Sequence, residues 1–366
     1  MRLLFFQNCV SPHQMPYIDV LSRRHRVSLV VPTIGLDSRR ALGWEESSVS
    51  SSVDLKVNPT VIEVRDLLNG KDGVRTVALF SGITAFPEVK KWLDISLDYD
   101  IERGIITEPP YTYRYPLWMH RLRFLLQDLR YVRHLDYVFA IGAGCVGYYR
   151  SWSHRWHVIP FAYSVEEMPG VSMAGIGAGK VSLCFVGSLD KRKDVMTLLR
   201  ALWLLRQEHP NAYRRYCLTI AGDGPERTTL HRYVSTHKME DCVTFVGVLP
   251  MPKARQLIAE SQALVLPSRH DGWGAVVSEA LLAGTTVYCS RQCGASVLVG
   301  SGRGRLFDAG HPQQLAQCLW EDFDLFNNEE HTTALRKQIK DWAETHISAE
   351  AIARRMEDGL EFKRKD

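Results

Sequence analysis

Two carboxylates, Asp271 and Glu279, stand eight positions apart in a stretch patterned as a strand, a loop and a helix. The apolar run at 263–266 is too short for a helix and predicts a buried strand of a parallel sheet. At 275–283 apolar residues recur every three or four positions, which predicts a helix ending at Gly284. Each carboxylate is able to accept two hydrogen bonds from a vicinal diol, and a helix N-terminus attracts phosphate. The stretch therefore suits a polyhydroxylated ligand that carries phosphate.

The alternative for this pair is that Asp271 caps the helix and Glu279 is a solvated helix residue. Most acidic pairs met at random have such structural roles. Here the surrounding strand and helix are otherwise apolar, whereas a fully exposed face would carry more charge. Gly272 and Gly274 also favour a binding site, because glycine lets ligand oxygens approach the backbone closely.

A cluster of cations follows a second expected strand, at 182–186. Lys191, Arg192 and Lys193 stand in a row in the loop before a helical pattern. A guanidinium binds phosphate oxygens in a fork and an ammonium adds a point charge, so this loop suits a diphosphate. Taken alone, a solvated charge run is the simpler explanation of three adjacent cations.

Two glycine-rich segments have the spacing of nucleotide-binding loops but lack the context. Gly142, Gly144 and Gly147 follow a strand pattern at the dinucleotide-binding spacing, yet the helix that they would open is short and they come late in the first half. The segment 175–180 precedes a strand and lacks the Ser or Thr of a phosphate-binding loop. With Pro169 and further glycines, it is typical of a linker between domains.

The runs from Pro267 to Gly274 and from Glu279 to Gly284 together resemble the acidic-x7-Glu signature of retaining glycosyltransferases of the GT-B fold, family 4. In that family both acidic positions are usually Glu, whereas Asp271 is one methylene shorter. The resemblance is strong over residues 180–320 and weak in the first half.

The loop at 187–194 is similar to a second element of that family, Gly-Arg-Leu-x-x-x-Lys-Gly. Lys193 stands at the Lys position, and Ser188 and Asp194 replace the Arg and the last Gly. Arg192 then supplies a guanidinium beside Lys193.

The resemblance implies a role for each matching position. Asp271 and the backbone of 272–274 contact the donor sugar, and Glu279 binds the ribose diol. Arg192 and Lys193 stabilise the leaving diphosphate, and with the two carboxylates they form the expected catalytic set. The expected donor-binding positions are Gly187, Ser188, Gly247, Val248, Leu249, His270, Gly272, Trp273, Gly274 and Ala275.

His13 and Glu108 are the acceptor-side candidates in the first half of the chain. His13 is the only titratable group in the loop after the first expected strand, at 2–6. Glu108 ends another expected strand, where open α/β sheets place ligand-contacting residues. A packed loop histidine and a structural glutamate are the alternatives.

Length and composition fit an ordinary globular protein of two domains. The chain has 366 residues, which is long for one core. The formal charge of +4 comes entirely from residues 1–160, because the remainder is balanced. This excess suits an anionic partner or a membrane surface, but it is small enough for a solvated surface, and no nucleic-acid partner is expected.

The cysteines and the lack of long apolar runs predict the compartment. Eight cysteines are scattered without a CxxC pair, so buried thiols in a reducing compartment are expected. The apolar run near the N-terminus is too short for a signal peptide, and no run reaches the roughly 18 residues of a membrane span. We expect a cytoplasmic protein, at most peripheral to the cytoplasmic membrane.

A helix expected at 116–135 has a marked apolar stripe among several arginines. The stripe consists of Trp118, Leu122, Leu125, Leu129 and Val132. Such a stripe most often faces a protein core, and that is the expectation here. Contact with lipid headgroups is the alternative.

Strand and helix patterns alternate, which predicts parallel sheets wrapped by helices. The expected fold is α/β, of the GT-B type, with two doubly wound Rossmann-like domains facing across a cleft. Residues 1–168 form the acceptor-side domain and 181–345 the nucleotide-sugar domain, with a linker at 169–180. A last helix within 346–366 is expected to return to the first domain.

The resemblance implies metal-independent transfer of a hexosyl group, with retention, from a nucleotide-diphosphate sugar to a hydroxyl. The acceptor is a glycan or a lipid-linked glycan, in cell-surface polysaccharide or lipopolysaccharide biosynthesis. No cofactor and no metal is expected. Two rivals stay open: a GT-B sugar-nucleotide epimerase, which needs no acceptor, and a non-catalytic nucleotide-sugar-binding protein.

Overall fold

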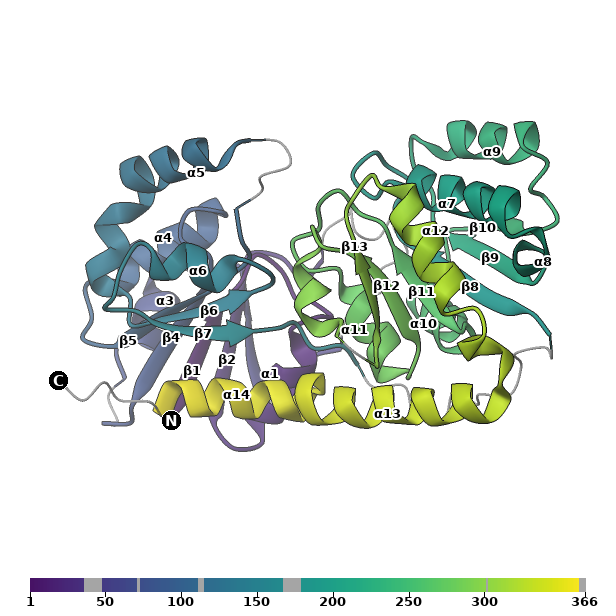
Figure 1. Cartoon of the computed structure of the whole chain (residues 1–366). Helices are drawn as coiled ribbons and strands as arrows, with labels where there is room; N and C mark the ends of the chain where they lie inside the picture. Colours follow the sequence, from purple (N-terminus) through teal and green to yellow (C-terminus); the bar gives the residue numbers. More distant parts are fainter. Residues whose placement is uncertain (36–47, 71–72, 111–114, 167–178, 301, 362–366) are drawn as a thin grey trace. The chain divides into compact units, whose positions relative to one another are not determined.

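A computed structural model describes residues 1–35, 48–70, 73–110, 115–166, 179–300 and 302–361 (Figure 1). The described residues form two compact units, each with its own parallel sheet. The first unit holds the described residues up to position 166 together with 349–361, and the second holds 179–348. Of the linker expected at 169–180, only the last two residues lie among those described.

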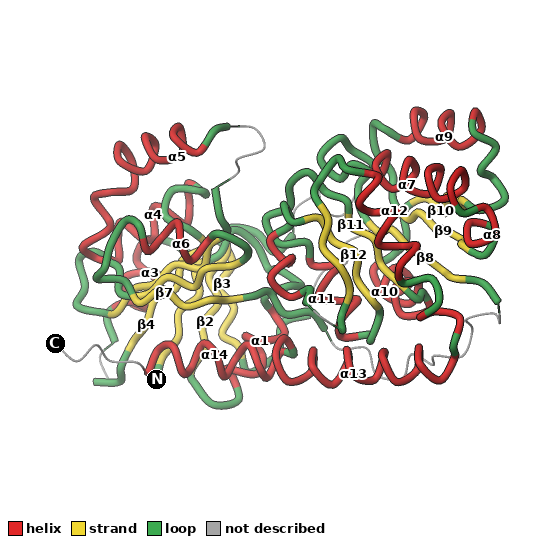
Figure 2. The backbone as a smooth tube through the Cα atoms, viewed as in Figure 1, coloured by secondary structure: helices red, strands yellow, loops and turns green. Residues whose placement is uncertain are grey.

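The first unit has a seven-stranded sheet in the order β3-β2-β1-β4-β5-β6-β7, and all neighbours run parallel. Figure 2 shows strands in yellow and helices in red. Central strands such as β6 are buried along their whole length, as expected where helices cover both faces. The strands are β1 (Arg2–Phe6), β2 (Arg26–Val31), β3 (Val53–Val57), β4 (Thr76–Ser81), β5 (Glu102–Thr107), β6 (Tyr137–Ile141) and β7 (His157–Phe161).

Short helices connect these strands. They are α1 (Met15–Ser22), α3 (Val61–Leu68), α4 (Pro87–Ser96), α5 (Leu117–Arg123), the π-helix η1 (Phe124–Asp128), the 3₁₀-helix η2 (Leu129–His134), α6 (Cys145–Arg150) and the C-terminal α14 (Ala349–Glu361). The helix α14 packs against α1 and β7, so the end of the chain belongs to the first unit. Arg24 donates a hydrogen bond to Glu357 at 2.8 Å, and His25 Nε2 lies 2.9 Å from the same carboxylate.

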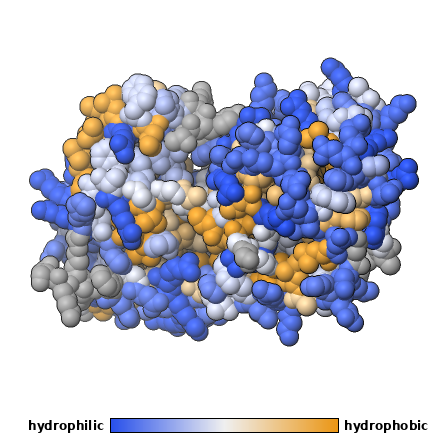
Figure 3. Space-filling model, viewed as in Figure 1, coloured by the Kyte–Doolittle hydropathy of each residue, from blue (hydrophilic) through white to orange (hydrophobic). Residues whose placement is uncertain are grey.

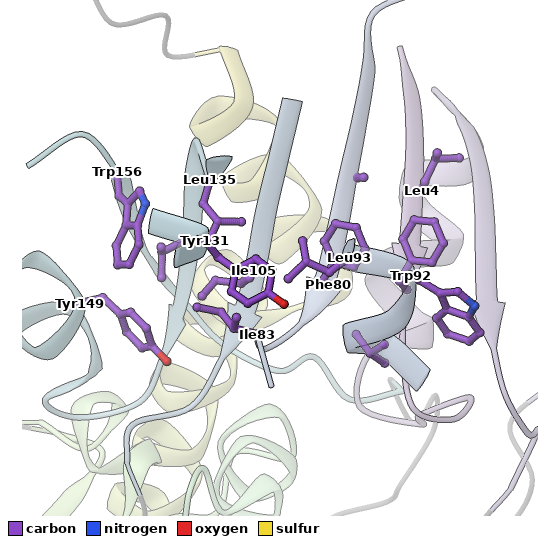
Figure 4. Packing of buried hydrophobic residues seen from close by; sticks show 14 of the residues in the cluster. Leu4, Phe80, Ile83, Trp92, Leu93, Ile105, Tyr131, Leu135, Tyr149 and Trp156 are labelled. Carbon is purple, nitrogen blue, oxygen red and sulfur yellow. The ribbon is translucent and has the colours of Figure 1, made fainter. Parts of the chain in front are cut away.

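Aromatic and aliphatic side chains fill the space between this sheet and its helices (Figure 4). Phe6 of β1 stacks on Phe80 of β4 with ring centroids 4.8 Å apart. Trp92 of α4 packs on the Phe6 ring, and Tyr131 of η2 is fully buried. This core fixes β1 and β4. The loops that follow the carboxyl ends of these strands lie at the edge where open α/β sheets bind ligands.

The second unit has a six-stranded parallel sheet in the order β10-β9-β8-β11-β12-β13. Its strands are β8 (Val181–Val186), β9 (Tyr216–Ala221), β10 (Val243–Gly247), β11 (Ala263–Leu266), β12 (Thr286–Ser290) and β13 (Gly304–Phe307). Its helices are α7 (Val195–Glu208), α8 (Pro210–Tyr213), α9 (Arg227–Thr236), α10 (Met251–Glu260), α11 (Ala275–Leu282), η3 (Gly294–Leu298), α12 (Pro312–Glu321), η4 (Leu325–Asn327) and α13 (Glu329–Ile347).

Both sheets reverse their strand order beside the first strand, between β1 and β4 and between β8 and β11. The loops leaving two such strands turn to opposite sides, and ligands of open α/β sheets bind in the resulting crevice at the carboxyl ends. The prediction of two doubly wound Rossmann-like domains is confirmed. In the second unit the reversal lies between the two strands that precede the expected catalytic residues.

The expectation of one helix at 116–135 with a core-facing stripe is wrong. The segment forms α5, η1 and η2 in succession, and Trp118 is 64% exposed. Phe124 and Tyr131 face the core instead. Two apolar stripes share this segment, and helical periodicity identifies a stripe without telling which one is covered.

No helix in the described part of the chain is both long and apolar enough to cross a bilayer. All eight cysteines are free thiols, and six of them are buried. The expectation of mostly buried thiols is confirmed.

Candidate active site

The loop between β8 and α7, at 187–194, is folded around Asp190. One carboxylate oxygen of Asp190 accepts a hydrogen bond from Lys193 N at 2.8 Å, and the other accepts one from Ser188 Oγ at 2.8 Å. Aspartate favours such turns because its short side chain bonds the backbone a few residues on. The turn therefore fixes the backbone from which the side chains of Arg192 and Lys193 project.

Glycine allows the loops at this edge of the sheet to pack closely. A Cβ at Gly222 would lie 1.8 Å from Gly187 O, and one at Gly294 would lie 1.9 Å from Gly272 O. Any side chain at Gly222 or Gly294 would displace a loop that carries expected donor-binding positions. The loops after β8 and β11 are thus each supported by the loop after a neighbouring strand.

Several contacts join the loop after β8 to the loop after β11, at 267–274. Arg269 N donates to Arg192 O at 2.8 Å, and Arg192 Nη1 donates to His270 O at 3.3 Å. The Arg269 guanidinium pairs with Asp194, with 2.9 Å between Nε and Oδ2. Because these loops flank the reversal of strand order, their side chains lie where a Rossmann-like domain binds its ligand.

Asp271, Lys193 and Arg192 form an ion cluster between the two loops. Lys193 Nζ donates a hydrogen bond to Asp271 Oδ2, and Arg192 Nη1 lies 3.7 Å from the same oxygen. Burial raises the pKa of Asp271, but the charges of Lys193 and Arg192 outweigh burial and hold that pKa below its usual value. Asp271 is therefore ionised at neutral pH, and two cations converge on one carboxylate.

The helix α11 begins beside this ion cluster without a side-chain cap. Its N-cap is Gly274, not Asp271, with a left-handed φ of 90°, and a glycine has no side chain to bond the first turn. The alternative that Asp271 caps this helix is therefore wrong. The N–H groups of Ala275 and its neighbour are left to meet an anion, as at many phosphate-binding helix ends.

Trp273 anchors the loop that precedes α11. Its side chain is 3% exposed, and its indole Nε1 donates to Ser278 Oγ at 3.1 Å. The ring thus belongs to the core. If position 273 contacts the donor as expected, its backbone atoms make that contact.

Glu279 lies in α11 and pairs with Arg255 of α10. Arg255 Nε is 3.0 Å from Glu279 Oε1, and both side chains are 9% exposed. Burial raises the pKa of Glu279, and the charge of Arg255 offsets only part of that effect. The alternative of a solvated Glu279 is wrong, because a buried guanidinium orients its carboxylate.

The positions expected near the base lie at the carboxyl end of β10: Gly247 is its last residue, and Val248 and Leu249 follow it. Gly222 N donates to Gly247 O at 2.7 Å, and Val248 is 41% exposed. Two strand spacings separate β10 from β8, or about 10 Å. These residues therefore share the sheet edge with the ion cluster, at the separation that an extended nucleotide would span.

The acceptor-side candidates lie in the first unit, after different strands. His13 O accepts a hydrogen bond from Ser164 N at 3.1 Å, and its ring lies 6.3 Å from the Tyr163 ring. Glu108 is exposed at the carboxyl end of β5. Since β4 separates β1 from β5, the two strands are about 10 Å apart. The two residues share the ligand-binding edge of the sheet without belonging to one loop.

Sequence reasoning assigned no role to Asp190, Asp194, Arg255 or Arg269. The role of Asp190 was recognisable in the sequence, because aspartate often forms turns by bonding the backbone a few residues on, as it does here with Lys193 N. Arg255 had no such signal, since it precedes Glu279 by 24 positions and lies on another helix. Its role depends on how α10 and α11 pack.

Among the described residues, no group of three or more His, Cys, Asp or Glu side chains is placed to hold a metal ion. Two Asp-x-Asp sequences occur, at 98–100 and 322–324. Asp98 pairs with Arg65 in the first unit, and Asp322 pairs with Arg305 in the second. The expectation of a metal-independent reaction stays a prediction.

Comparison with known proteins identifies the domain that carries this site. Residues 174–342 match the family model described as Glycosyl transferases group 1. A D-inositol 3-phosphate glycosyltransferase of Pseudarthrobacter chlorophenolicus is 30% identical over 177 residues, which are 47% of this chain and 42% of that protein. The chain thus spans less than half the length of this relative.

Solved structures resemble the whole chain in fold. The Anabaena protein HepE, in complex with UDP, has a TM-score of 0.71 at 17% identity, covering 98% of this chain and 99% of that one. WaaG, a glycosyltransferase involved in lipopolysaccharide biosynthesis, has a TM-score of 0.62 at 14% identity, covering 98% of each chain. The fold is that of GT-B glycosyltransferases.

Proposed function

We propose that this chain, whose residues 174–342 match the glycosyl transferases group 1 family, is a retaining glycosyltransferase of family 4. It transfers a hexosyl group from a nucleotide-diphosphate sugar to a hydroxyl of a glycan or lipid-linked acceptor. The observation that carries the proposal is the ion cluster of Asp271, Lys193 and Arg192 beside the uncapped start of α11. Such a site offers cations and helix N–H groups to a diphosphate and a carboxylate to sugar hydroxyls.

In this proposal the second unit binds the donor along the carboxyl edge of its sheet. The diphosphate lies against Arg192, Lys193 and the N-terminus of α11. Asp271 and the backbone at 272–274 bind the sugar, and Glu279 binds the ribose diol. The UDP complex of HepE supports this assignment, because that protein shares the fold.

The chemistry requires stabilisation of a leaving group. The bond between the anomeric carbon and the diphosphate oxygen breaks while negative charge builds on the diphosphate. Arg192 and Lys193 stabilise that charge more in the transition state than in the ground state, which is what accelerates the step. The acceptor hydroxyl attacks from the face that the diphosphate leaves, and a phosphate oxygen takes its proton. The configuration is therefore retained, with neither a metal nor a cofactor in this scheme.

We place the acceptor at the first unit, where His13 and Glu108 lie at the ligand-binding edge. The likeness to WaaG favours a role in cell-surface polysaccharide or lipopolysaccharide biosynthesis. The proposed location is the cytoplasm, with peripheral contact to the membrane.

A donor screen tests the proposed function against its rivals. The full chain is mixed with UDP-, GDP-, ADP- and dTDP-sugars, and thermal stabilisation and slow hydrolysis are measured. A glycosyltransferase is stabilised by one nucleotide class and slowly hydrolyses its donor. Release of an epimerised nucleotide sugar would indicate the epimerase, and stabilisation without turnover would indicate a binding protein.

Asp271→Asn is expected to impair transfer while leaving affinity for the free nucleoside diphosphate within about threefold of wild type. The amide keeps the size of the carboxylate but loses the charge that binds sugar hydroxyls, and hydrogen bonds to a charged group contribute about 1.5–3 kcal/mol. Calorimetry with the nucleotide and initial rates with the nucleotide sugar separate the two effects. Transfer at the wild-type rate would show that the charge of Asp271 is needed neither to bind the sugar nor to position Lys193.

Glu279→Gln is expected to weaken donor binding about 10- to 100-fold, since an amide replaces a charged acceptor on the ribose diol. Because the substitution also disturbs the pair with Arg255, affinity alone is not diagnostic. The decisive comparison is between the ribose nucleotide and its 2′-deoxy analogue. Wild type should prefer ribose, and the variant should lose that preference. A preference kept by a folded variant would contradict the ribose assignment.

A further inference from the structure

An apolar strip lies exposed on the first unit where α5 leads into η1 and η2. Of the seventeen exposed large hydrophobic residues in the described chain, eight fall within fifteen positions. Trp118 and Leu126 are 64% and 76% exposed. Figure 3 shows hydrophobic side chains gathered over α5. This α5 strip consists of Tyr115, Leu117, Trp118, Met119, Leu122, Leu125, Leu126 and Leu129.

The strip faces outward because other side chains of the same segment fill the core. Phe124 stacks on Trp152 with ring centroids 4.2 Å apart. Tyr131 is fully buried and donates a hydrogen bond to Asp94. Within η1, Leu129 N donates to Phe124 O, the wider turn of a π-helix. The packing thus leaves the α5 strip uncovered within the first unit.

Cations border the strip. Arg121, Arg123, Arg130 and Arg133 all lie between positions 117 and 134, where Asp128 is the only acidic residue. Asp128 accepts a hydrogen bond from Thr84 Oγ1 at 2.7 Å, so its carboxylate is turned toward the β4 loop. Arg130 Nη2 lies 3.5 Å from Asp94 Oδ1, so the positive charge on the strip's border comes from Arg121, Arg123 and Arg133.

A shallow hollow of about 770 Å³ continues the strip at Leu129. Its lining combines arginines with aromatic, aliphatic and small polar side chains: Arg130, Arg133, Arg155, Trp152, His154, Leu129, Val132 and Ser153. Among the described residues, no acidic side chain lines it. The hollow suits a phosphate-bearing headgroup beside an apolar surface.

We propose that the α5 strip and this basic hollow dock the first unit onto an anionic lipid surface. Leucine and tryptophan side chains enter the boundary between headgroups and acyl chains, while arginines pair with lipid phosphates. The positive charge favours a lipid surface over a second copy of the chain as the partner. A two-fold interface through this patch would place the same arginines face to face, and they would repel each other. The inference assigns a surface to the membrane contact named under the proposed function, and it does not rest on glycosyl transfer, since the strip shares no residue with the donor site.

Co-sedimentation of the full chain with vesicles tests the proposal. Vesicles of phosphatidylcholine with about 30% phosphatidylglycerol should bind the protein, and pure phosphatidylcholine should bind it at least tenfold more weakly. Binding should fall as salt rises from about 0.05 to 0.5 M, because the Debye length shortens. No sedimentation with the anionic vesicles at low salt would overturn the proposal.

Matched variants assign the binding to this surface. Trp118→Ser and Leu126→Ser should each weaken binding about tenfold, since each removes a side chain that is buried only in the lipid. Ile62→Ser is the control, because Ile62 is 72% exposed on α3 of the same unit. Equal binding by these three variants and wild type would overturn the proposal.

A second pair of variants tests the basic hollow. Arg133→Gln with Arg155→Gln should weaken binding to anionic vesicles roughly 10- to 30-fold, as two charges near the surface are lost. Lys56→Gln with Arg65→Gln removes two cations of the same unit elsewhere and should change binding less than threefold. If light scattering instead shows a dimer that Leu126→Ser abolishes, a second copy is the occupant and the proposal fails.

Discussion

Lys193→Ala is expected to lower the turnover number about 100-fold, close to 3 kcal/mol of transition-state stabilisation. The physical reason is the charge that develops on the departing diphosphate, which the ammonium of Lys193 meets inside a site where Lys193 is 12% exposed. Steady-state kinetics with a fixed acceptor measures the effect. Lys253→Ala, an exposed lysine on α10 of the same unit, is the control and should change turnover less than twofold.

The pH dependence of the Lys193 variant gives a second readout. In the wild type, Lys193 and Arg192 hold the pKa of Asp271 below its ordinary value of 3.8, so Asp271 stays ionised across the neutral and mildly acidic range. Removing Lys193 removes one of the charges that lower the pKa of Asp271. The effect of burial, which raises this pKa, is then less compensated, and the pKa rises. Activity of the variant should therefore fall at a higher pH than activity of the wild type as the solution is acidified. Normal turnover with only a raised Michaelis constant would make Lys193 a binding residue alone.

The sheets and the donor-site loops were predictable because their signals are local. Short Val- and Ile-rich runs identify strands such as β11, and a helical pattern after each run predicts a parallel sheet. The pattern around Asp271 and Glu279 placed the first in a loop and the second on the helix that follows, and the structure has them there. The ion cluster also followed in part, because consecutive cations after β8 and an acid after β11 share the crevice once the strand order is known.

What escaped prediction depends on contacts between distant elements. The pattern from Trp118 to Leu129 defined an apolar stripe correctly, but Phe124 and Tyr131 occupy the core side of the same segment. Only the packing of Phe124 on Trp152 decides which stripe is covered. The pair of Glu279 with Arg255 is of the same kind, since it arises from helix packing and has no signature in sequence spacing.

Arg255→Met is expected to destabilise the chain by about 3–5 kcal/mol at pH 7. The variant leaves the carboxylate of Glu279 buried without the guanidinium that now lies 3.0 Å away, and removing one partner of a buried pair has a cost of that size. The loss is measured by urea unfolding of the full chain. The relevant transition is the one whose midpoint shifts when the donor binds, because that transition reports the second unit. Arg354→Met, on the first-unit helix α14 where the side chain is 69% exposed, is the control and should cost less than about 1 kcal/mol.

The loss should depend on pH with a definite sign. Burial already raises the pKa of Glu279 above its ordinary value of 4.5, and removing Arg255 raises it further. A carboxyl whose pKa is raised by folding disfavours the folded state above its unfolded pKa, and that penalty disappears once the group is protonated in both states. The deficit of Arg255→Met should thus be largest near neutral pH and shrink as pH falls toward 4.5. Adding Glu279→Gln to Arg255→Met should recover much of the stability at pH 7 without restoring the preference for ribose, because the buried charge is gone but the diol has lost its acceptor. A deficit that is independent of pH and unaffected by the second substitution would mean that Arg255 acts through packing of its stem on α11 and not through the carboxylate of Glu279.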